Sequence, residues 1–151
     1  MINSFGLDEK LILIDKRLSD NEIKNLIRSC DSFVSLHRSE GFGRGLTEAM
    51  YLGKPVIGTG YSGNLDFMNC ENSILVDYKM IPVEKAQYPY YLDQYWADAD
   101  IEQAKNYMEK LTTDMSYCSD LGKRAKIKIR KDFSYRATGL NYLSRIRQLY
   151  A

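Results

Sequence analysis

The sequence is poor in the side chains that most often carry out catalysis or bind metals. Its 151 residues include one histidine, His37, and three cysteines, Cys30, Cys70 and Cys118. A single histidine argues against a Ser-His-Asp hydrolase and against a metal site built from several imidazoles. The cysteines are odd in number and far apart, which argues against a zinc site and against a complete disulfide framework. We expect reduced and mostly buried thiols.

Long hydrophobic runs are also absent. No stretch of about 18 apolar residues occurs, and residues 1–15 lack the basic, apolar and small-residue order of a secretory signal. We therefore expect a cytoplasmic protein. The 27% charged residues, 12% aromatic residues and 10 glycines are typical of one soluble globular domain, and they exclude a disordered or collagen-like chain.

The charges are nearly balanced overall but unevenly distributed. The net charge is +1, yet residues 1–120 carry −7 and residues 121–151 carry +8. The basic run Gly122–Lys131 is typical of a solvated helix face. The alternative is attraction to anionic lipid, as a peripheral protein at the inner face of the membrane. We expect no nucleic-acid partner, because no nucleic-acid-binding motif accompanies the charge.

Alternating strand and helix patterns predict an α/β fold with a parallel sheet covered by helices. The expected strands are the short apolar runs Leu11–Asp15, Ser32–Leu36, Pro55–Thr59 and Ser73–Val76. The expected helices between them are Ser19–Cys30, Leu46–Leu52 and Leu65–Met68. The first of these helices begins with the spacing of a capping box, Ser19 followed by Glu22.

The segment Asp77–Ala99 predicts a long connection without regular structure. Its aromatic residues are expected to pack onto their own domain rather than to stack on a nucleobase or a sugar; they are Tyr88, Tyr90, Tyr91, Tyr95 and Trp96. Residues 100–151 predict three closing helices, namely one capped by Asp100, one over Ser116–Lys131 and one that begins near Ser134. The last should bury one apolar face, made of Ala137, Leu140, Leu143 and Ile146.

The strongest candidate for a site is the glycine-rich segment HRSEGFGRGLTE, between an expected strand and an expected helix. Its three glycines would allow a ligand to approach the backbone closely. Free amides of Arg44, Gly45, Leu46 and Thr47 in the first helical turn, together with the helix dipole, favour an anion such as phosphate. The guanidinium of Arg44 adds a positive charge.

Two carboxylates flank this candidate anion site, since Glu40 lies at the end of the strand and Glu48 lies within the helix. Carboxylates repel phosphate but accept hydrogen bonds from the hydroxyls of a sugar and of a ribose. A nucleotide sugar has that arrangement of groups. The alternative is a tight strand-to-helix turn with two solvated glutamates.

The segment from Ser35 to Met68, SLHRSEGFGRGLTEAMYLGKPVIGTGYSGNLDFM, resembles the C-terminal domain of retaining family-4-type glycosyltransferases. Their signature is a pair of glutamates separated by seven residues, within a Glu-Gly-Phe-Gly loop that a helix follows. The resemblance continues through NCENSILVD to Phe133–Tyr135. It implies a Rossmann-like domain that forms the C-terminal half of a GT-B fold and binds a nucleoside-diphosphate sugar.

The resemblance also implies roles for individual residues. Glu40 would be catalytic and contact the transferred sugar, and Glu48 would hold the ribose hydroxyls. The remaining donor-binding residues would line the sugar and the phosphates: Gly41, Phe42, Gly43, Leu46 and Thr47. Apart from the resemblance, the position of His37 between the second strand and the glutamate loop could bring a hydrogen-bond donor to the phosphate or sugar, although a lone histidine is more often structural. Arg44 is either a further phosphate ligand or an exposed side chain. Transfer would need no metal and no cofactor.

The resemblance further implies that residues 1–151 form a single domain without its first strand-helix unit and without the acceptor-binding domain. We therefore expect a donor-binding domain in polysaccharide biosynthesis that is inactive alone and meets a saccharide or lipid-linked acceptor through another domain. The alternative is a non-catalytic interaction module or split-enzyme half. Such a module would associate, for example as a homo-oligomer, through its truncated sheet edge.

Overall fold

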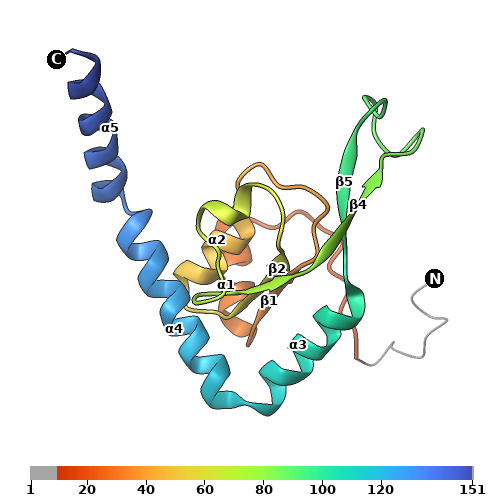
Figure 1. Cartoon of the computed structure of the whole chain (residues 1–151). Coiled ribbons are helices and arrows are strands. Elements are labelled where there is room, and N and C mark those ends of the chain that lie inside the picture. Colours follow the sequence, from red (N-terminus) through yellow and green to blue (C-terminus); the bar gives the residue numbers. More distant parts are fainter. Residues whose placement is uncertain (1–9, 151) are drawn as a thin grey trace.

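A small parallel sheet forms the centre of the computed structural model, which describes residues 10–150 (Figure 1). Its three strands are β1 (Phe33–Ser35), β2 (Val56–Thr59) and β3 (Ile74–Val76), in the order β1-β2-β3. Both pairings are parallel, and Ile57 of β2 is in register with Val34 on one side and Ile74 on the other. The predicted α/β fold with a helix-covered parallel sheet is confirmed.

Five α-helices accompany the sheet among the described residues. They are α1 (Asp20–Ser29), α2 (Arg44–Tyr51), α3 (Ile101–Thr113), α4 (Met115–Asp132) and α5 (Tyr135–Leu149), and Gly63–Asp66 form a 3-10 turn. The capping box of α1 is confirmed, because the Glu22 amide donates to Ser19 Oγ and the Ser19 amide donates to Glu22 Oε2. The hydrogen bonds that the Ser19 amide and hydroxyl donate to the Glu22 carboxylate lower the pKa of Glu22.

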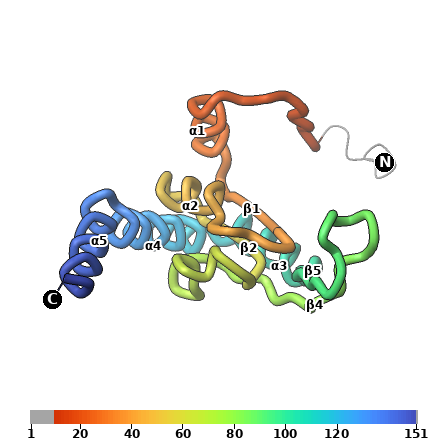
Figure 2. Tube along the Cα trace, turned by 90° about the horizontal axis from the view of Figure 1, so that it is seen from above, coloured from red at the N-terminus to blue at the C-terminus, as the bar shows by residue number. Residues whose placement is uncertain are grey.

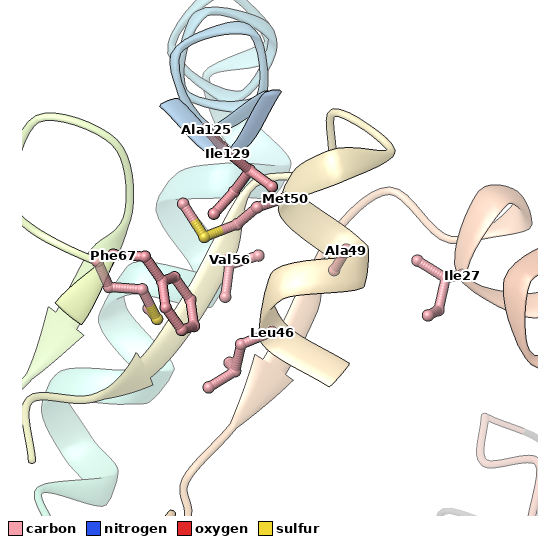
Figure 3. Packing of buried hydrophobic residues seen from close by; sticks show 9 residues of the cluster. Ile27, Leu46, Ala49, Met50, Val56, Phe67, Ala125 and Ile129 are labelled. Atoms are coloured by element: carbon pink, nitrogen blue, oxygen red, sulfur yellow. The ribbon is translucent and has the colours of Figure 1, made fainter. Parts of the chain in front are cut away.

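Neighbouring residues of β2 enter hydrophobic clusters on opposite faces of the sheet, as strand geometry requires. Val56 packs with residues of α2 and α4, including Met50 and Ile129 (Figure 3). Ile57 instead packs with residues of α3 and α4, such as Leu111 and Leu121. Because α4 contributes to both clusters, it joins the two layers that hold the sheet.

The strand predicted at Leu11–Asp15 is wrong, since these residues form no strand. Their apolar side chains are exposed, with Ile12 at 88% and Leu13 at 71%. A strand needs a neighbour for its backbone hydrogen bonds, and no strand of residues 10–150 pairs with this segment. In Figure 2 the segment lies beyond α1, away from the sheet.

The burial predicted for the last helix is also wrong. Helix α5 has no buried residue, and Leu140 and Ile146 are 57% and 51% exposed. The helix continues from the end of α4 away from the sheet (Figure 1). Its apolar face, which includes Ala137 and Leu143, therefore lacks the packing surface on which burial depends within the described part of the chain.

The predicted long connection is instead a two-stranded antiparallel hairpin made of β4 (Tyr78–Pro82) and β5 (Tyr95–Ala99). The hairpin begins directly after β3 and ends at Asp100, the N-cap of α3. Sequence reasoning missed it because each strand is short and a 12-residue connection joins them. None of the described helices is long and apolar enough to cross a membrane.

The thiols differ from the expectation of general burial. Cys30 and Cys70 are exposed, whereas Cys118 on α4 is buried. Burial raises the pKa of the Cys118 thiol, and the nearby Asp31 carboxylate raises it further. Since the thiolate is the reactive form, Cys118 should be the least reactive of the three.

We predict that a chromogenic disulfide reagent at neutral pH modifies Cys30 and Cys70 rapidly and Cys118 slowly. Absorbance should therefore rise in a fast phase of two thiols and a slow phase of one. Cys118→Ser should remove the slow phase alone, and Cys70→Ser should reduce the fast phase by half. Three equally fast thiols in the native protein would contradict the burial of Cys118.

Candidate functional site

Two loops meet at the carboxyl ends of β1 and β2, where open α/β sheets bind their ligands. The first loop follows β1 and contains Glu40, and the second follows β2 and contains Ser62 and Gly63. The Glu40 amide donates a hydrogen bond to Ser62 Oγ at 2.8 Å, and the Gly63 amide donates to the Glu40 carbonyl at 3.0 Å. The backbone of Glu40 is thereby fixed on both sides.

Gly63 allows this close approach of the two loops. A Cβ atom at this position would collide with the carbonyl group of Gly41. The preceding Ser62 has a φ of 73°, a conformation that is unfavourable for a residue with a side chain. Sequence reasoning did not recognise that this turn supports the site.

His37 links the same two loops rather than pointing at an open surface. Its Nε2 lies 3.1 Å from Asn64 Oδ1 and 3.2 Å from the Tyr61 carbonyl, so this nitrogen carries the proton and donates. Buried Asn64 in turn donates to the Thr59 carbonyl at 2.9 Å. Thr59 Oγ1 completes the network by donating to the His37 carbonyl. This network favours the structural interpretation of His37, and its contact with a donor stays a prediction.

Helix α2 is preceded by its N-cap residue Gly43, whose φ of 93° is left-handed. No side chain caps this end, so the first amides of the helix point out of the loop toward a potential ligand. The first backbone hydrogen bond of the helix runs from the Thr47 amide to the Gly43 carbonyl at 2.9 Å. The expectation of a free Thr47 amide is therefore wrong, whereas the amides of Arg44, Gly45 and Leu46 precede that bond.

Arg44 forms an ion pair with one of the two candidate carboxylates. Its Nε lies 2.8 Å from Glu48 Oε1, and a second nitrogen lies 3.6 Å from Asp20 of α1. The hydrogen bond and the charge of Glu48 raise the pKa of Arg44. The side chain of Arg44 is 73% exposed, whereas that of Glu48 is 24% exposed. Arg44 is thus exposed and also close to the candidate anion site.

A cavity of about 290 Å³ opens beside Glu48. Helix α1 provides Asp20, Ile23 and Lys24 to its walls, and α2 provides Arg44, Gly45 and Glu48. Another cavity, of about 520 Å³, includes Ser32 and Pro55, which precede β1 and β2. It therefore lies at the amino ends of the strands, away from the glutamate loop, and we do not assign it to the site.

The tip of the glutamate loop is anchored by aromatic packing. The ring of Phe42 lies 5.2 Å from that of Phe67 and 6.1 Å from that of Phe133, between ring centres. Phe133 follows α4, so the closing helices stabilise the loop. Phe42 remains 43% exposed, and its neighbour Glu40 is half-buried.

The hairpin is attached to the glutamate loop by Arg38, which sequence reasoning did not single out. The Arg38 carbonyl accepts a hydrogen bond from the Ala97 amide at 2.9 Å, and its guanidinium lies over the ring of Trp96. Trp96 packs onto its own domain as expected. The same expectation is wrong for three tyrosines, because Tyr88, Tyr90 and Tyr95 are 53%, 78% and 60% exposed.

Together, a parallel sheet, a glycine-rich loop at its carboxyl edge and an uncapped helix start define a Rossmann-like α/β domain. The chain belongs to the family described as glycosyl transferases group 1, whose family model matches residues 1–128. No curated protein matches the sequence.

Several solved structures share this fold. The HepE protein of Anabaena, in complex with UDP and glucose, has a TM-score of 0.73 at 18% identity over 97% of this chain. The C-terminal domain of the group 1 glycosyl transferase LpcC from Francisella tularensis has a TM-score of 0.68 at 21% identity over 89% of the chain. Sucrose-phosphate synthase from Thermosynechococcus elongatus has a TM-score of 0.70 at 21% identity over 99%.

The chain spans only part of each of these structures. It covers 34% of HepE, 59% of the LpcC domain and 32% of sucrose-phosphate synthase. These matches establish the fold as that of one domain of a GT-B glycosyltransferase.

We predict that Gly43→Ala lowers the free energy of unfolding. Alanine would have to adopt the left-handed backbone of this position, at a cost of about 1–2 kcal/mol. The Cβ would also lie 2.9 Å from Leu46 Cδ1 in the core. Gly41→Ala is the matched control, since its Cβ would meet no atom within 4 Å. Urea unfolding should place Gly43→Ala clearly below the native protein and Gly41→Ala near it. Equal stability of the two variants would contradict the conformation of this loop.

Proposed function

We propose that this chain is the donor-binding domain of a retaining glycosyltransferase and binds a nucleoside-diphosphate sugar. The observation that carries this proposal is the start of α2, between Glu40 and Glu48, where no side chain caps the helix and three amides precede its first hydrogen bond. Helix amides and the helix dipole bind phosphate in many proteins. Carboxylates on either side suit the hydroxyl groups at the two ends of a nucleotide sugar.

The diphosphate would bind to the amides of Arg44, Gly45 and Leu46. Arg44 could add a positive charge, because its side chain is 73% exposed and its ion pairs in water are weak. Its guanidinium could therefore move from Glu48 to a phosphate oxygen, which would free Glu48 to accept hydrogen bonds. This arrangement reconciles the two interpretations of Arg44, exposed in the free protein and a phosphate ligand in the complex.

The nucleoside would occupy the cavity beside Glu48. This cavity of about 290 Å³ lies between α1 and α2, and Glu48 forms part of its wall. A ribose there could donate hydrogen bonds from its hydroxyls to the carboxylate of Glu48. The HepE relative, which binds UDP and glucose in its own structure, supports a uracil nucleotide as the first probe.

Glu40 would face the transferred sugar from the opposite side of the helix start. During transfer the bond between the anomeric carbon and the diphosphate oxygen breaks, and its electron pair stays on the diphosphate. The amides at the start of α2 would stabilise this developing negative charge. The new bond to an acceptor hydroxyl forms on the same face of the sugar, and the proton of that hydroxyl passes to the leaving diphosphate.

A second candidate function is association with another polypeptide that completes the sheet. Strand β1 is an edge of the three-stranded sheet, and the apolar segment Leu11–Ile14 is exposed. Unpaired strand edges and exposed apolar segments both favour association. This candidate is compatible with donor binding, because the acceptor side of the enzyme would come from another domain or a partner chain.

Several basic side chains of the run on α4 make contacts within the fold. Arg124 donates to the Glu71 carbonyl, the guanidinium of Arg130 lies over the ring of Tyr51, and Lys128 pairs with Asp132. We infer that this run serves mainly as a solvated helix face. Peripheral membrane contact, as the alternative, would have to use its remaining basic side chains.

We predict that the chain binds UDP, measured by calorimetry and by NMR shift changes at millimolar nucleotide. Glu48→Ala should weaken UDP binding about tenfold, because it removes a hydrogen-bond acceptor with a full charge. Glu40→Ala should leave UDP binding unchanged and reduce the additional affinity for UDP-glucose. Glu109→Ala, on the distant helix α3, is the matched control.

An absence of shift changes with UDP, GDP and ADP alike would refute donor binding. If Glu40→Ala weakened UDP binding and Glu48→Ala did not, the roles of the two glutamates would be reversed. That result would contradict the assignment above.

Association through the exposed segment is tested by sedimentation velocity. We predict that the native chain forms a dimer at high concentration, and that Ile12→Asp combined with Leu13→Asp shifts it to a monomer. The two introduced aspartates would place negative charges in the dimer interface and so weaken it. Ile101→Asp, at another exposed apolar side chain, should leave the dimer unchanged. A native chain that stays monomeric at all concentrations would reject self-association as the function of this segment.

A further inference from the structure

The cavity of about 520 Å³ at the amino ends of β1 and β2 lies on the edge of the sheet opposite the glutamate loop. Its volume falls within the range of about 300–1,000 Å³ that is usual for small-molecule sites. Its wall is made of residues before β1, of the turn between α2 and β2, and of the consecutive helices α3 and α4, which join at the bottom of Figure 1. The proposed function does not use this cavity.

Two glycines bring α4 directly onto the turn that follows α2. Gly53, whose φ of 81° is left-handed, comes after the last residues of α2, and its amide donates to the Met50 carbonyl at 2.9 Å. A Cβ atom on Gly122 of α4 would collide with the Gly53 carbonyl. The aliphatic chain of Lys126 also lies against Gly53, because a Cβ atom there would be 3.4 Å from Lys126 Cδ. The wall between α2 and α4 is therefore set by close backbone packing.

Positive charge predominates around this cavity. Its lining carries three ammonium groups and one carboxylate, which belong to Lys54, Lys123, Lys126 and Asp31. Lys54 Nζ donates to the Arg28 carbonyl at 2.8 Å, so this ammonium is held in place by a neutral partner. Lys123 pairs with Asp120 at 3.2 Å, but both side chains are exposed, and such a pair is weak in water. The lining therefore favours an anion.

Five further side chains of the lining are apolar, namely Leu52, Pro55, Leu111, Met115 and Cys118. Leu111 and Cys118 are buried members of one hydrophobic cluster, whereas Met115 is exposed. A bare ion such as phosphate would leave this apolar surface in contact with water. An apolar group attached to the anion would cover it, and removal of that surface from water would stabilise the complex.

We propose that this cavity, which we call the lysine cavity, binds an amphiphilic anion, that is, a small molecule in which a carboxylate or phosphate is joined to an apolar chain. The head group would accept charge-assisted hydrogen bonds from the ammonium groups of Lys54 and Lys126. The chain would lie along the apolar wall and cover Cys118. A free fatty acid and a membrane lipid share this chemistry, and the experiment below separates the two sources.

The direct test is a calorimetric titration of the full chain with decanoate, at concentrations where decanoate is monomeric. We expect binding in the millimolar range or tighter. Lys126→Met keeps an apolar stem but removes the ammonium, so it should weaken binding about fivefold, whereas Lys126→Arg should retain most of it. Lys131→Met is the matched control, because Lys131 is exposed on the same helix and does not line the cavity. Decyltrimethylammonium has the same chain with a positive head group, and it should bind roughly tenfold more weakly than decanoate.

Cys118 provides a second measurement that reports the place of binding without any substitution. Saturating decanoate should slow the reaction of the Cys118 thiol with an uncharged chromogenic disulfide reagent, because the chain would cover the sulfur atom. The rates for Cys30 and Cys70 should be unchanged, because neither residue lines the cavity. Saturating UDP should not displace decanoate, since the two sites lie at opposite edges of the sheet.

Several results would overturn the proposal. No binding of decanoate, or binding that leaves the Cys118 rate unchanged, would reject the lysine cavity as the site. Equal binding of decanoate and decyltrimethylammonium would reject the role of the lysines, and equal binding of decanoate and inorganic phosphate would reject that of the apolar wall. Equal weakening by Lys126→Met and Lys131→Met would reduce the effect to the overall charge of α4, and displacement by UDP would place decanoate in the donor site.

Vesicles of phosphatidylglycerol separate the two sources of the anion. If they bind the chain in a Lys126-dependent way in addition to monomeric decanoate, the proposal holds with a membrane lipid as the source. If decanoate binds and the vesicles do not, the proposal holds with a free amphiphile. Binding of the vesicles without binding of decanoate would assign these lysines to a membrane surface and reject the cavity.

Discussion

The site depends above all on two hydrogen bonds that join the loops after β1 and β2. Both involve the backbone of Glu40, whose amide donates to Ser62 Oγ and whose carbonyl accepts from the Gly63 amide. They require a glycine at position 63, where a side chain would collide with the Gly41 carbonyl. With Glu40 fixed in this way, the chain turns through left-handed Gly43 into α2, and the helix start is aimed at the same edge of the sheet.

The buried polar network beneath these bonds explains why the only histidine in the sequence lies where it does. His37, Thr59 and Asn64 satisfy one another and the backbone of both loops. A polar group buried without a partner is costly, so each of the three requires the other two. The network therefore specifies one arrangement of the loops, which a purely apolar contact would specify less strictly.

The parts of the fold that could be predicted from sequence are those whose information is local. The capping box at Ser19, the short strands of the sheet and the strand-loop-helix that contains Glu40 and Glu48 all depend on neighbouring residues. The failures, by contrast, concern partners distant in the sequence. The segment Leu11–Asp15 has the composition of a strand but no strand beside it, and α5 has an apolar face but no surface to cover it. Spacing alone did not place Asp20 beside Arg44, nor Arg38 beneath Trp96, because both contacts depend on the tertiary fold.

The position of the hairpin depends both on the order of elements along the chain and on contacts between residues distant in sequence. It begins where β3 ends, and the carboxyl ends of parallel strands share one edge, so topology alone brings it to the loops of β1 and β2. The contacts of Arg38 and Tyr61 then attach it there. Tyr61 immediately precedes Ser62, the residue that fixes Glu40, so the packing of Tyr78 of β4 against Tyr61 links the start of the hairpin to the site.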